Sequence, residues 1–276
     1  MSGCEVLDGV QRDSGVGAIA AGAHDAVLWD AIGSWVQHHR VPVAVGGMGT
    51  SSVGIVETPY VDTPTDAASL AAGVVSMHWR GVELLALPGV RVDSGGGRFD
   101  VMRGEELEIL GSNCDPGVVV LAGSHCKWVW WDPPVIGEFR TYLTGELYAA
   151  TSTATLLARS LAEGVRARPG EAFRAAVREV AESSLVHQLF SVRTESLRGA
   201  DAQQCADRLA GLIIGAEVLD ALEWAHRPRS VSLVAAAELA ALYREAFGVH
   251  GVAVEVIAAD AAARGIARVI RERGGR

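Results

Sequence analysis

The sequence has few cysteines, no excess of basic charge and no long apolar run. Its four cysteines include no Cys-x-x-Cys pair and join no His/Cys cluster, so neither a zinc site nor a disulfide framework is indicated. No apolar run approaches the roughly 18 residues of a membrane-spanning helix, and the N-terminus lacks the pattern of a secretory signal. Reduced thiols and no leader predict a cytoplasmic protein.

The charge balance restricts the partners. The formal net charge is -9, from 24 basic and 33 acidic residues. A nucleic acid or an anionic membrane surface needs clustered basic charge, so neither is expected as a partner. Any phosphate must therefore be bound by a few local groups.

The 276 residues are enough for one large domain or two of ordinary size. Of these residues 49% are hydrophobic, which is enough for a sizeable core. Alanine-rich helical patterns and short valine-rich runs together predict an α/β or α+β fold. The turn NCDPG at 113–117 is the expected domain boundary. The apolar spacing predicts helices at 25–38, 65–77, 100–110, 171–190, 201–224 and from Asp260 to 270. It predicts strands at 4–11, 41–45, 83–87, 118–121, 128–131, 135–143, 231–234 and 252–257.

The segment 118–131, VVVLAGSHCKWVWW, is the most informative part of the chain. It predicts a buried strand, a small polar turn that contains Lys127, and a second strand. Backbone N–H groups of such a turn, together with a lysine, can bind a phosphate. An ordinary hairpin with a polar tip explains the same spacing equally well.

Six motifs follow one another in order and together resemble one family. They are GGMGTSSVG (46–54), ETPY (57–60), VMRGEE (101–106), LAGSHCKWV (121–129), FRTYLTGEL (139–147) and GLIIGAEV (211–218). This order resembles the 2-dehydro-3-deoxygalactonokinase family. The resemblance implies an α/β fold of two ribonuclease-H-like domains, of the sugar kinase, Hsp70 and actin type, with a cleft between them. Residues 1–113 would form the substrate-side domain and residues 117–276 the nucleotide-side domain.

The resemblance also implies a reaction. ATP, with Mg²⁺, would phosphorylate the 6-hydroxyl of 2-dehydro-3-deoxy-D-galactonate in galactonate catabolism. The partners would be these two small molecules, and a homodimer is left open. The chain itself suggests no separate metal site.

Particular residues gain expected roles from the resemblance. Gly123, Ser124, His125 and Lys127 would form a phosphate loop, and Ala236 would lie in a turn that meets the nucleotide. A loop of glycines and serines would contact the sugar acid, since glycine permits close approach and serine offers a hydroxyl; a plain turn is the alternative. This loop contains Gly47, Met48, Ser51 and Ser52, and a second polar set contains Arg140, Thr144 and Glu146. Thr144 could equally be a helix N-cap.

The cluster MRGEE would supply the catalytic groups. Related sugar kinases carry the carboxylate that accepts the hydroxyl proton at this place in the chain, which points to Glu105 or Glu106. Arg103 would pair with the substrate carboxylate, because a guanidinium binds a carboxylate in bidentate fashion. A solvated first helical turn, in which acidic residues are favoured by the helix dipole, would explain the same pair of glutamates.

Two departures from the family pattern leave an alternative open. No Asp-Trp-Gly segment occurs, so we expect the first domain to lack its N-terminal strand, through either a misassigned start or real loss. A Gly-Thr-Ser type turn is replaced by 235–238, AAAE, where Ala236 would be strained if its φ were positive and Glu238 would bring negative charge. The alternative function is that of a non-catalytic or decayed sugar-acid-binding relative that has lost ATP use.

Overall fold

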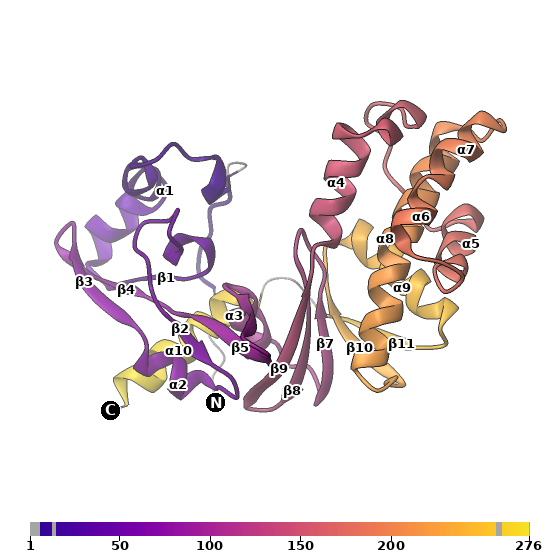
Figure 1. Ribbon diagram of the computed structural model, residues 1–276. Coiled ribbons are helices and arrows are strands. Elements are labelled where there is room, and N and C mark those ends of the chain that lie inside the picture. Colours follow the sequence, from indigo (N-terminus) through magenta and orange to yellow (C-terminus); the bar gives the residue numbers. More distant parts are fainter. Residues whose placement is uncertain (1–5, 13–14, 258–260, 276) are drawn as a thin grey trace. The chain divides into compact units, whose positions relative to one another are not determined.

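The computed structural model describes residues 6–12, 15–257 and 261–275, which form two compact units (Figure 1). Unit 1 consists of Met1–Cys114, Trp131–Glu138 and Ala259–Arg276, and unit 2 consists of Asp115–Trp130 and Phe139–Ala258. The chain therefore differs from a single division between 113 and 117, because it returns twice to unit 1.

Unit 1 is an α/β unit with two small mixed sheets. Their strand orders are β1-β4-β3 and β2-β5-β6, and in each sheet one pair is parallel and one antiparallel. The strands are β1 (Val43–Val45), β2 (Tyr60–Asp62), β3 (Val75–Trp79), β4 (Val82–Ala86), β5 (Gly89–Gly95) and β6 (Arg98–Met102). The helices are α1 (His24–His39), α2 (Ala67–Ala72), α3 (Glu105–Gly111) and α10 (Ala262–Gly274), with 3-10 turns η1 (Val16–Ala18) and η2 (Gly47–Thr50).

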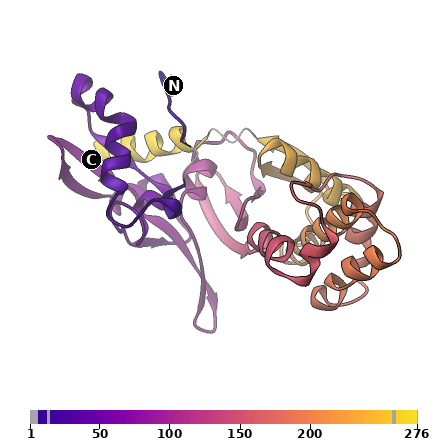
Figure 2. The same ribbon diagram turned by 90° about the horizontal axis from the view of Figure 1, so that it is seen from above.

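Helix α10 belongs to unit 1 because glycines let it lie directly against α3. A Cβ on Gly265 would lie 1.9 Å from the carbonyl oxygen of Leu107, and one on Gly111 would lie 1.9 Å from that of Ala261. Only glycine fits at such a crossing. Figure 2 shows the yellow C-terminal helix beside the indigo and purple elements of unit 1. The packing fixes α3, whose first residue is Glu105.

Unit 2 is built on a mixed sheet with the order β11-β10-β7-β8-β9, in which β10 pairs in parallel with both β7 and β11. The strands are β7 (Gly117–Leu121), β8 (Cys126–Asp132), β9 (Val135–Tyr142), β10 (Ser230–Val234) and β11 (Ala253–Ile257). The helices are α4 (Thr144–Ala154), α5 (Glu171–Glu179), α6 (Leu185–Leu189), α7 (Ser191–Leu197), α8 (Ala202–Trp224) and α9 (Ala237–Val249), with 3-10 turn η3 (Leu156–Ser160).

Helix α8 is the centre of unit 2. A capping box of Asp201 and Gln204 begins it, and its apolar residues pack with Trp128 and the valines of β7 in one core. Its glycines face α5, since a Cβ on Gly211 would lie 2.5 Å from the Phe173 carbonyl oxygen. The motif GLIIGAEV is therefore a packing surface as well as part of the core.

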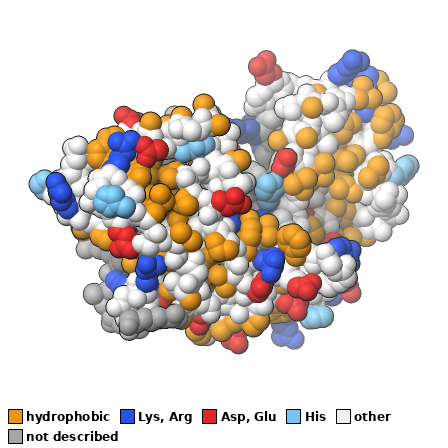
Figure 3. Space-filling model, turned by 60° about the vertical axis from the view of Figure 1, so that its left-hand side comes forward, with side chains coloured by type: hydrophobic (Ala, Val, Ile, Leu, Met, Phe, Trp, Pro, Cys, Tyr) orange, Lys and Arg blue, Asp and Glu red, His pale blue; other side chains and the backbone are white. Residues whose placement is uncertain are grey.

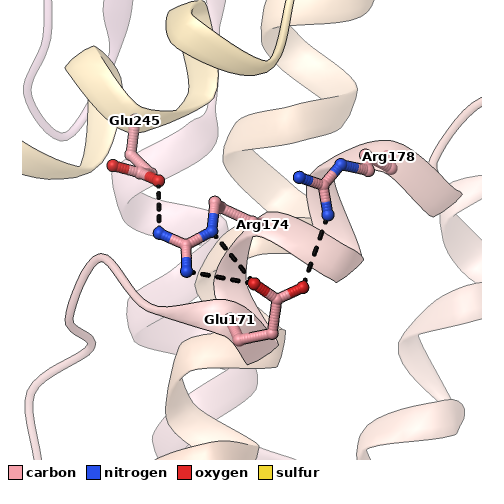
Figure 4. A network of polar contacts seen from close by, with 4 residues as sticks. All are labelled: Glu171, Arg174, Arg178 and Glu245. Atoms are coloured by element: carbon pink, nitrogen blue, oxygen red, sulfur yellow. Dashed lines mark hydrogen bonds and ion pairs between the residues drawn. The ribbon is translucent and has the colours of Figure 1, made fainter.

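An ion-pair network joins α5 to α9 (Figure 4). Arg174 lies 2.7 Å from Glu245 on α9 and 3.0 Å from Glu171 on its own helix, and Arg178 lies 3.4 Å from Glu171. These side chains are partly or largely exposed, so each pair contributes little to stability, about 0–1 kcal/mol. The network therefore links the surfaces of the two helices and adds little to the stability of the core.

The surface of the molecule mixes apolar and charged side chains. Figure 3 shows hydrophobic side chains lying between charged ones on one face. In unit 1 the exposed large apolar residues come from several separate segments: Val6, Leu7, Val10, Val41, Met48, Val53, Tyr60, Val75, Met77 and Phe99. Scattered exposure of this kind is ordinary for a folded protein.

The predicted N-terminal strand is wrong over the residues that can be compared. Residues 6–12 form no regular secondary structure, and residues 4 and 5 lie outside the described residues. The side chain of Leu7 is 90% exposed, so the apolar residues of this segment face no core. Apolar residues spaced along a segment do not form a strand when no neighbouring strand or core covers their side chains.

Three predicted helices have other bounds. The helix at 65–77 ends at Ala72 and is followed by β3, and residues 98–102 are strand β6 rather than helix. A strand forms here because Gly95, Gly96 and Gly97 all have positive φ and turn the chain back, so that β6 pairs with β5 in a hairpin. The helix at 171–190 breaks into α5 and α6, and the expected cap at Asp260 lies outside the described residues.

Candidate active site

Two turns of unit 2 lie side by side at the carboxyl ends of parallel strands. Leu121 of β7 is paired with Val234 of β10, and the Ala122 amide donates to the Val234 carbonyl oxygen at 2.9 Å. The turn 122–125 and the turn 235–236 therefore start from the same edge of the sheet. Ligands of open α/β sheets commonly bind at such an edge.

The turn 122–125 rests on the N-terminus of α4. The Glu146 amide donates to the Ser124 carbonyl oxygen at 3.1 Å, and the His125 ring nitrogen lies 2.6 Å from the Glu146 carboxylate. A Cβ on Gly145 would lie 2.4 Å from the Gly123 carbonyl oxygen, so only glycine allows this contact. The motifs AGSH and TGE thus form one local structure.

Lys127 lies in strand β8 and not in the turn, because the strand begins at Cys126. It is the only lysine of the chain. Its side chain is 3% exposed, and its ammonium donates to the His125 carbonyl oxygen at 3.4 Å. A solvated turn lysine is therefore excluded, and the cation is held just behind the turn.

A cavity of about 360 Å³ opens where these turns meet. Gly123 and Thr144, from two of the six motifs, and Ala236, from the turn that departs from the family pattern, all line it. Thr144 was expected at the sugar acid. The other walls of the cavity are mostly apolar and come from α4, α8, α9 and the loop before α5. They are Gly145, Tyr148, Val165, Arg166, Ala167, Ala210, Ile213, Ile214, Glu238, Leu239, Leu242 and Tyr243.

The turn 235–238 is not strained. Ala236 has φ -62° and ψ 150° and is the N-cap residue of α9, so alanine is accommodated without backbone strain and the predicted strain is wrong. Glu238, in the first turn of α9, forms an ion pair with Arg166 across the rim of the cavity. The arginine offsets the negative charge that the sequence places there.

Arg140 and Thr144 both contact α8. Arg140 lies 3.5 Å from Asp220 and 5.4 Å from the centroid of the Trp224 ring. Thr144, 7% exposed, neighbours the buried carboxylate of Glu217 on α8 and helps to lower the pKa that burial raises. Its side chain makes no N-cap bond, so the cap alternative is wrong.

The turn before α3 in unit 1 is held by its own glutamates. Glu105 accepts the Arg103 amide at 2.9 Å and Glu106 accepts the Gly104 amide at 2.8 Å. Gly104 has φ 116°, and a Cβ there would lie 3.2 Å from the Cα of Gly47, so the MRGEE turn packs against the GGMG turn. Two motifs more than fifty residues apart thus meet.

The two glutamates differ in exposure. Glu106 has no exposed surface, and burial, the largest cause, raises the pKa of its carboxyl to about 8. Its Oε1 has no hydrogen-bond partner among the described residues. Glu105 is partly exposed. Glu106 therefore cannot touch a ligand in this structure, whereas Glu105 can.

Arg103 organises the same region. Its guanidinium donates to the hydroxyls of Thr50 and Thr58 at 3.0 and 2.6 Å and to the Thr58 carbonyl oxygen at 2.9 Å. The group also lies 4.3 Å from the centroid of the Tyr60 ring. The ETPY motif thus supplies partners for Arg103. Contact of Arg103 with a substrate carboxylate stays a prediction.

The GGMG turn exposes part of the predicted sugar-acid loop. Met48 is 50% exposed, Ser52 is exposed, and the Ser51 hydroxyl donates to the Met48 carbonyl oxygen at 2.8 Å. Gly47 has φ 63°, which fixes the turn. The loop therefore exposes backbone groups and the side chain of Ser52 to solvent on the surface of unit 1.

Sequence reasoning missed Tyr148, Arg166, Glu217 and Tyr243. Of these four, only Glu217 could have been noticed in the sequence, because it is an acidic residue inside the apolar motif GLIIGAEV. Among the described residues, no three His, Cys, Asp or Glu side chains gather as a metal site. No helix in the described part of the chain is long and apolar enough to cross a membrane.

Known proteins resemble this chain over most of its length. It is 31% identical over 264 residues to 2-dehydro-3-deoxygalactonokinase of Escherichia coli (strain K12), covering 94% of this chain and 88% of that protein. It is 32% identical over 233 residues to a Rhizobium meliloti (strain 1021) protein named Probable 2-dehydro-3-deoxygalactonokinase DgoK1, covering 82% and 76%. A crystal structure from Sinorhizobium meliloti, of a candidate 2-dehydro-3-deoxygalactonokinase, has TM-score 0.82 and 29% identity, covering 89% of this chain and 84% of that chain.

The family model described as 2-keto-3-deoxy-galactonokinase matches residues 1–269. This match confirms the resemblance that rests on the six ordered motifs, and it includes both units. The chain belongs to the 2-keto-3-deoxy-galactonokinase family, a family of kinases.

Proposed function

We propose that this protein transfers the γ-phosphoryl group of ATP to the 6-hydroxyl of 2-dehydro-3-deoxy-D-galactonate. The observation that carries the proposal is the cavity of unit 2, at which three motifs of a kinase family converge. Its volume of about 360 Å³ is within the ordinary range of small-molecule sites. The E. coli relative is named for this activity.

The residues of the cavity fit a nucleotide. Ile213, Ile214 and Leu239 offer apolar surface to a base, whereas the amides of the turn 122–125 and of the first turn of α9 offer donors to phosphates. Lys127 adds positive charge behind the turn. When ATP is bound, Mg²⁺ would neutralise part of its phosphate charge. Thr144 belongs to this nucleotide set rather than to the sugar acid.

Unit 1 would supply the acid-binding and base groups. The sugar O6–H bond breaks as O6 bonds to the γ-phosphorus, the bond from that phosphorus to ADP breaks, and the proton goes to a carboxylate. Glu105 is the base in this proposal, since it is partly exposed, and Glu106 holds the Gly104 amide. The GGMG loop would contact the polyol.

Other features of the proposal follow from the family. The strand order of unit 2 supports a ribonuclease-H-like domain of the sugar kinase, Hsp70 and actin type. ATP and a catabolic sugar acid meet in the cytoplasm, where we place the enzyme. Arg140 and Glu146 as sugar-acid ligands, a homodimer and a shortened first domain stay predictions.

A coupled ADP-release assay tests the function, with the product identified by phosphorus NMR as a 6-phosphate. ADP release should require the keto-deoxy acid. Glu105→Gln should lower kcat by about a hundredfold or more, and Glu106→Gln should lower it less. Binding of the acid by calorimetry without any ADP release would instead support the non-catalytic alternative.

A further inference from the structure

Glu217 is a buried acid that the proposed chemistry does not use. It lies on α8, is 4% exposed, and is surrounded by the apolar core that includes Trp128 and Val218. Burial raises the pKa of its carboxyl. A carboxyl group is unfavourable in such a place unless several donors satisfy it.

Donors from two other elements converge on this carboxyl group. The Trp128 indole of β8 donates to Oε1 at 2.8 Å, and the Tyr243 hydroxyl of α9 donates to Oε2 at 2.6 Å. The neighbouring side chains of Thr144, at the start of α4, and Cys126, at the start of β8, help to lower the pKa that burial raises. One carboxyl group thus joins α8 to β8 and α9.

Its neighbours, and not Glu217 itself, line the cavity of unit 2. Thr144 and Tyr243 are both cavity residues. Cys126 ends the turn 122–125, where its thiol lies 3.5 Å from the Gly123 carbonyl oxygen and 3.0 Å from the Tyr243 hydroxyl. Tyr243 is therefore bonded to Glu217 directly, and Cys126, beside the turn, is connected to it through the Tyr243 hydroxyl.

We infer that Glu217 is the positioning residue of the nucleotide site: by accepting hydrogen bonds from Trp128 and Tyr243, it holds β8, which follows the turn 122–125, and α9 in the geometry that binds phosphates. The inference rests on the proposed function, since it takes the cavity to be the nucleotide site. The two carboxylate oxygens of Glu217 reach β8 and α9 at the same time.

Glu217→Gln tests this role with little change in volume. The glutamine amide can accept from Trp128, but its NH2 group can only donate to the Tyr243 hydroxyl, which must then turn and accept. The bond that supports α9 is thereby reversed and loses its charged acceptor. We expect the Kd for Mg·ADP, measured by calorimetry, to rise about tenfold. The Kd for the sugar acid should stay unchanged, because the GGMG loop lies in unit 1.

Glu223→Gln is the matched control, since Glu223 is an exposed glutamate of the same helix that pairs with Arg227. Should Glu217→Gln not fold, Tyr243→Phe removes one hydrogen bond only and should weaken Mg·ADP binding severalfold. The inference is overturned if folded Glu217→Gln or Tyr243→Phe protein binds Mg·ADP with wild-type affinity. It is also overturned if the affinities for Mg·ADP and for the sugar acid fall equally. Neither result affects the proposed function. A wild-type protein that binds no nucleotide overturns the proposed function together with it.

Discussion

Gly145→Ala should damage the nucleotide site through one added methyl group. The new Cβ would lie 2.4 Å from the Gly123 carbonyl oxygen and 2.8 Å from the Ser124 Cα, and both are backbone atoms. Neither can rotate away, so the turn 122–125 must move off α4. The Glu146 amide then loses its bond to the Ser124 carbonyl oxygen.

The size of the effect can be worked from these contacts. Overpacking costs about 1–3 kcal/mol and the lost hydrogen bond about 1 kcal/mol. Replacing a helical glycine by alanine returns about 0.5–1 kcal/mol. The free energy of unfolding should therefore fall by about 1–3 kcal/mol, and nucleotide affinity should fall as well because the phosphate amides are displaced.

Urea unfolding followed by tryptophan fluorescence and calorimetric binding of Mg·ADP measure the two effects. Gly248→Ala is the control, because a Cβ at this helical position in α9 meets nothing within 4 Å. It should gain about 0.5–1 kcal/mol. Equal stability and equal nucleotide affinity in the two variants would refute the reasoning about the turn.

Two further predictions concern buried ionisable groups. Lys127→Met removes the only lysine while keeping an unbranched side chain, and kcat/KM for ATP should fall about a hundredfold in steady-state assays; an unchanged value would argue against a phosphate role. Glu106 has its pKa raised from 4.5 to about 8 in the folded protein, so its contribution to stability is present below pH 4.5 and is lost as the pH rises to about 8. Wild type should therefore lose up to about 1.4 kcal/mol per pH unit relative to Glu106→Gln in that window. Urea unfolding at pH 5 and pH 8 measures it, and a constant difference between the two proteins would contradict the burial argument.

Sequence patterns predicted the parts of the fold that depend on local spacing. The strands around the turn 122–125 and the helix α8 follow from apolar runs and an apolar stripe, and the structure has both. The return of α10 to unit 1 could not be predicted, because it depends on glycines at 111 and 265 that meet only in three dimensions. The β5–β6 hairpin was missed because its glycine run is equally typical of a loop.

The site was predictable only where a motif carried it. Gly123 and Thr144 come from two motifs and Ala236 from the turn at the place of a family motif, and the structure brings them to one cavity. The apolar residues that complete the cavity, such as Leu239, are indistinguishable from core residues in the sequence. Which of Glu105 and Glu106 is buried depends on how α3 packs against α10 and the GGMG turn. This packing is tertiary, so the local sequence pattern does not predict it.

The most direct test of the account is Mg·ATP binding to a protein whose unit 2 cavity is filled. Ala167 lines the cavity, whereas Ala162 is exposed in the same loop and does not. Calorimetry should show Mg·ATP binding to wild type and to Ala162→Trp, and none to Ala167→Trp. Binding of Mg·ATP to Ala167→Trp with wild-type affinity would contradict the claim that this cavity is the nucleotide site.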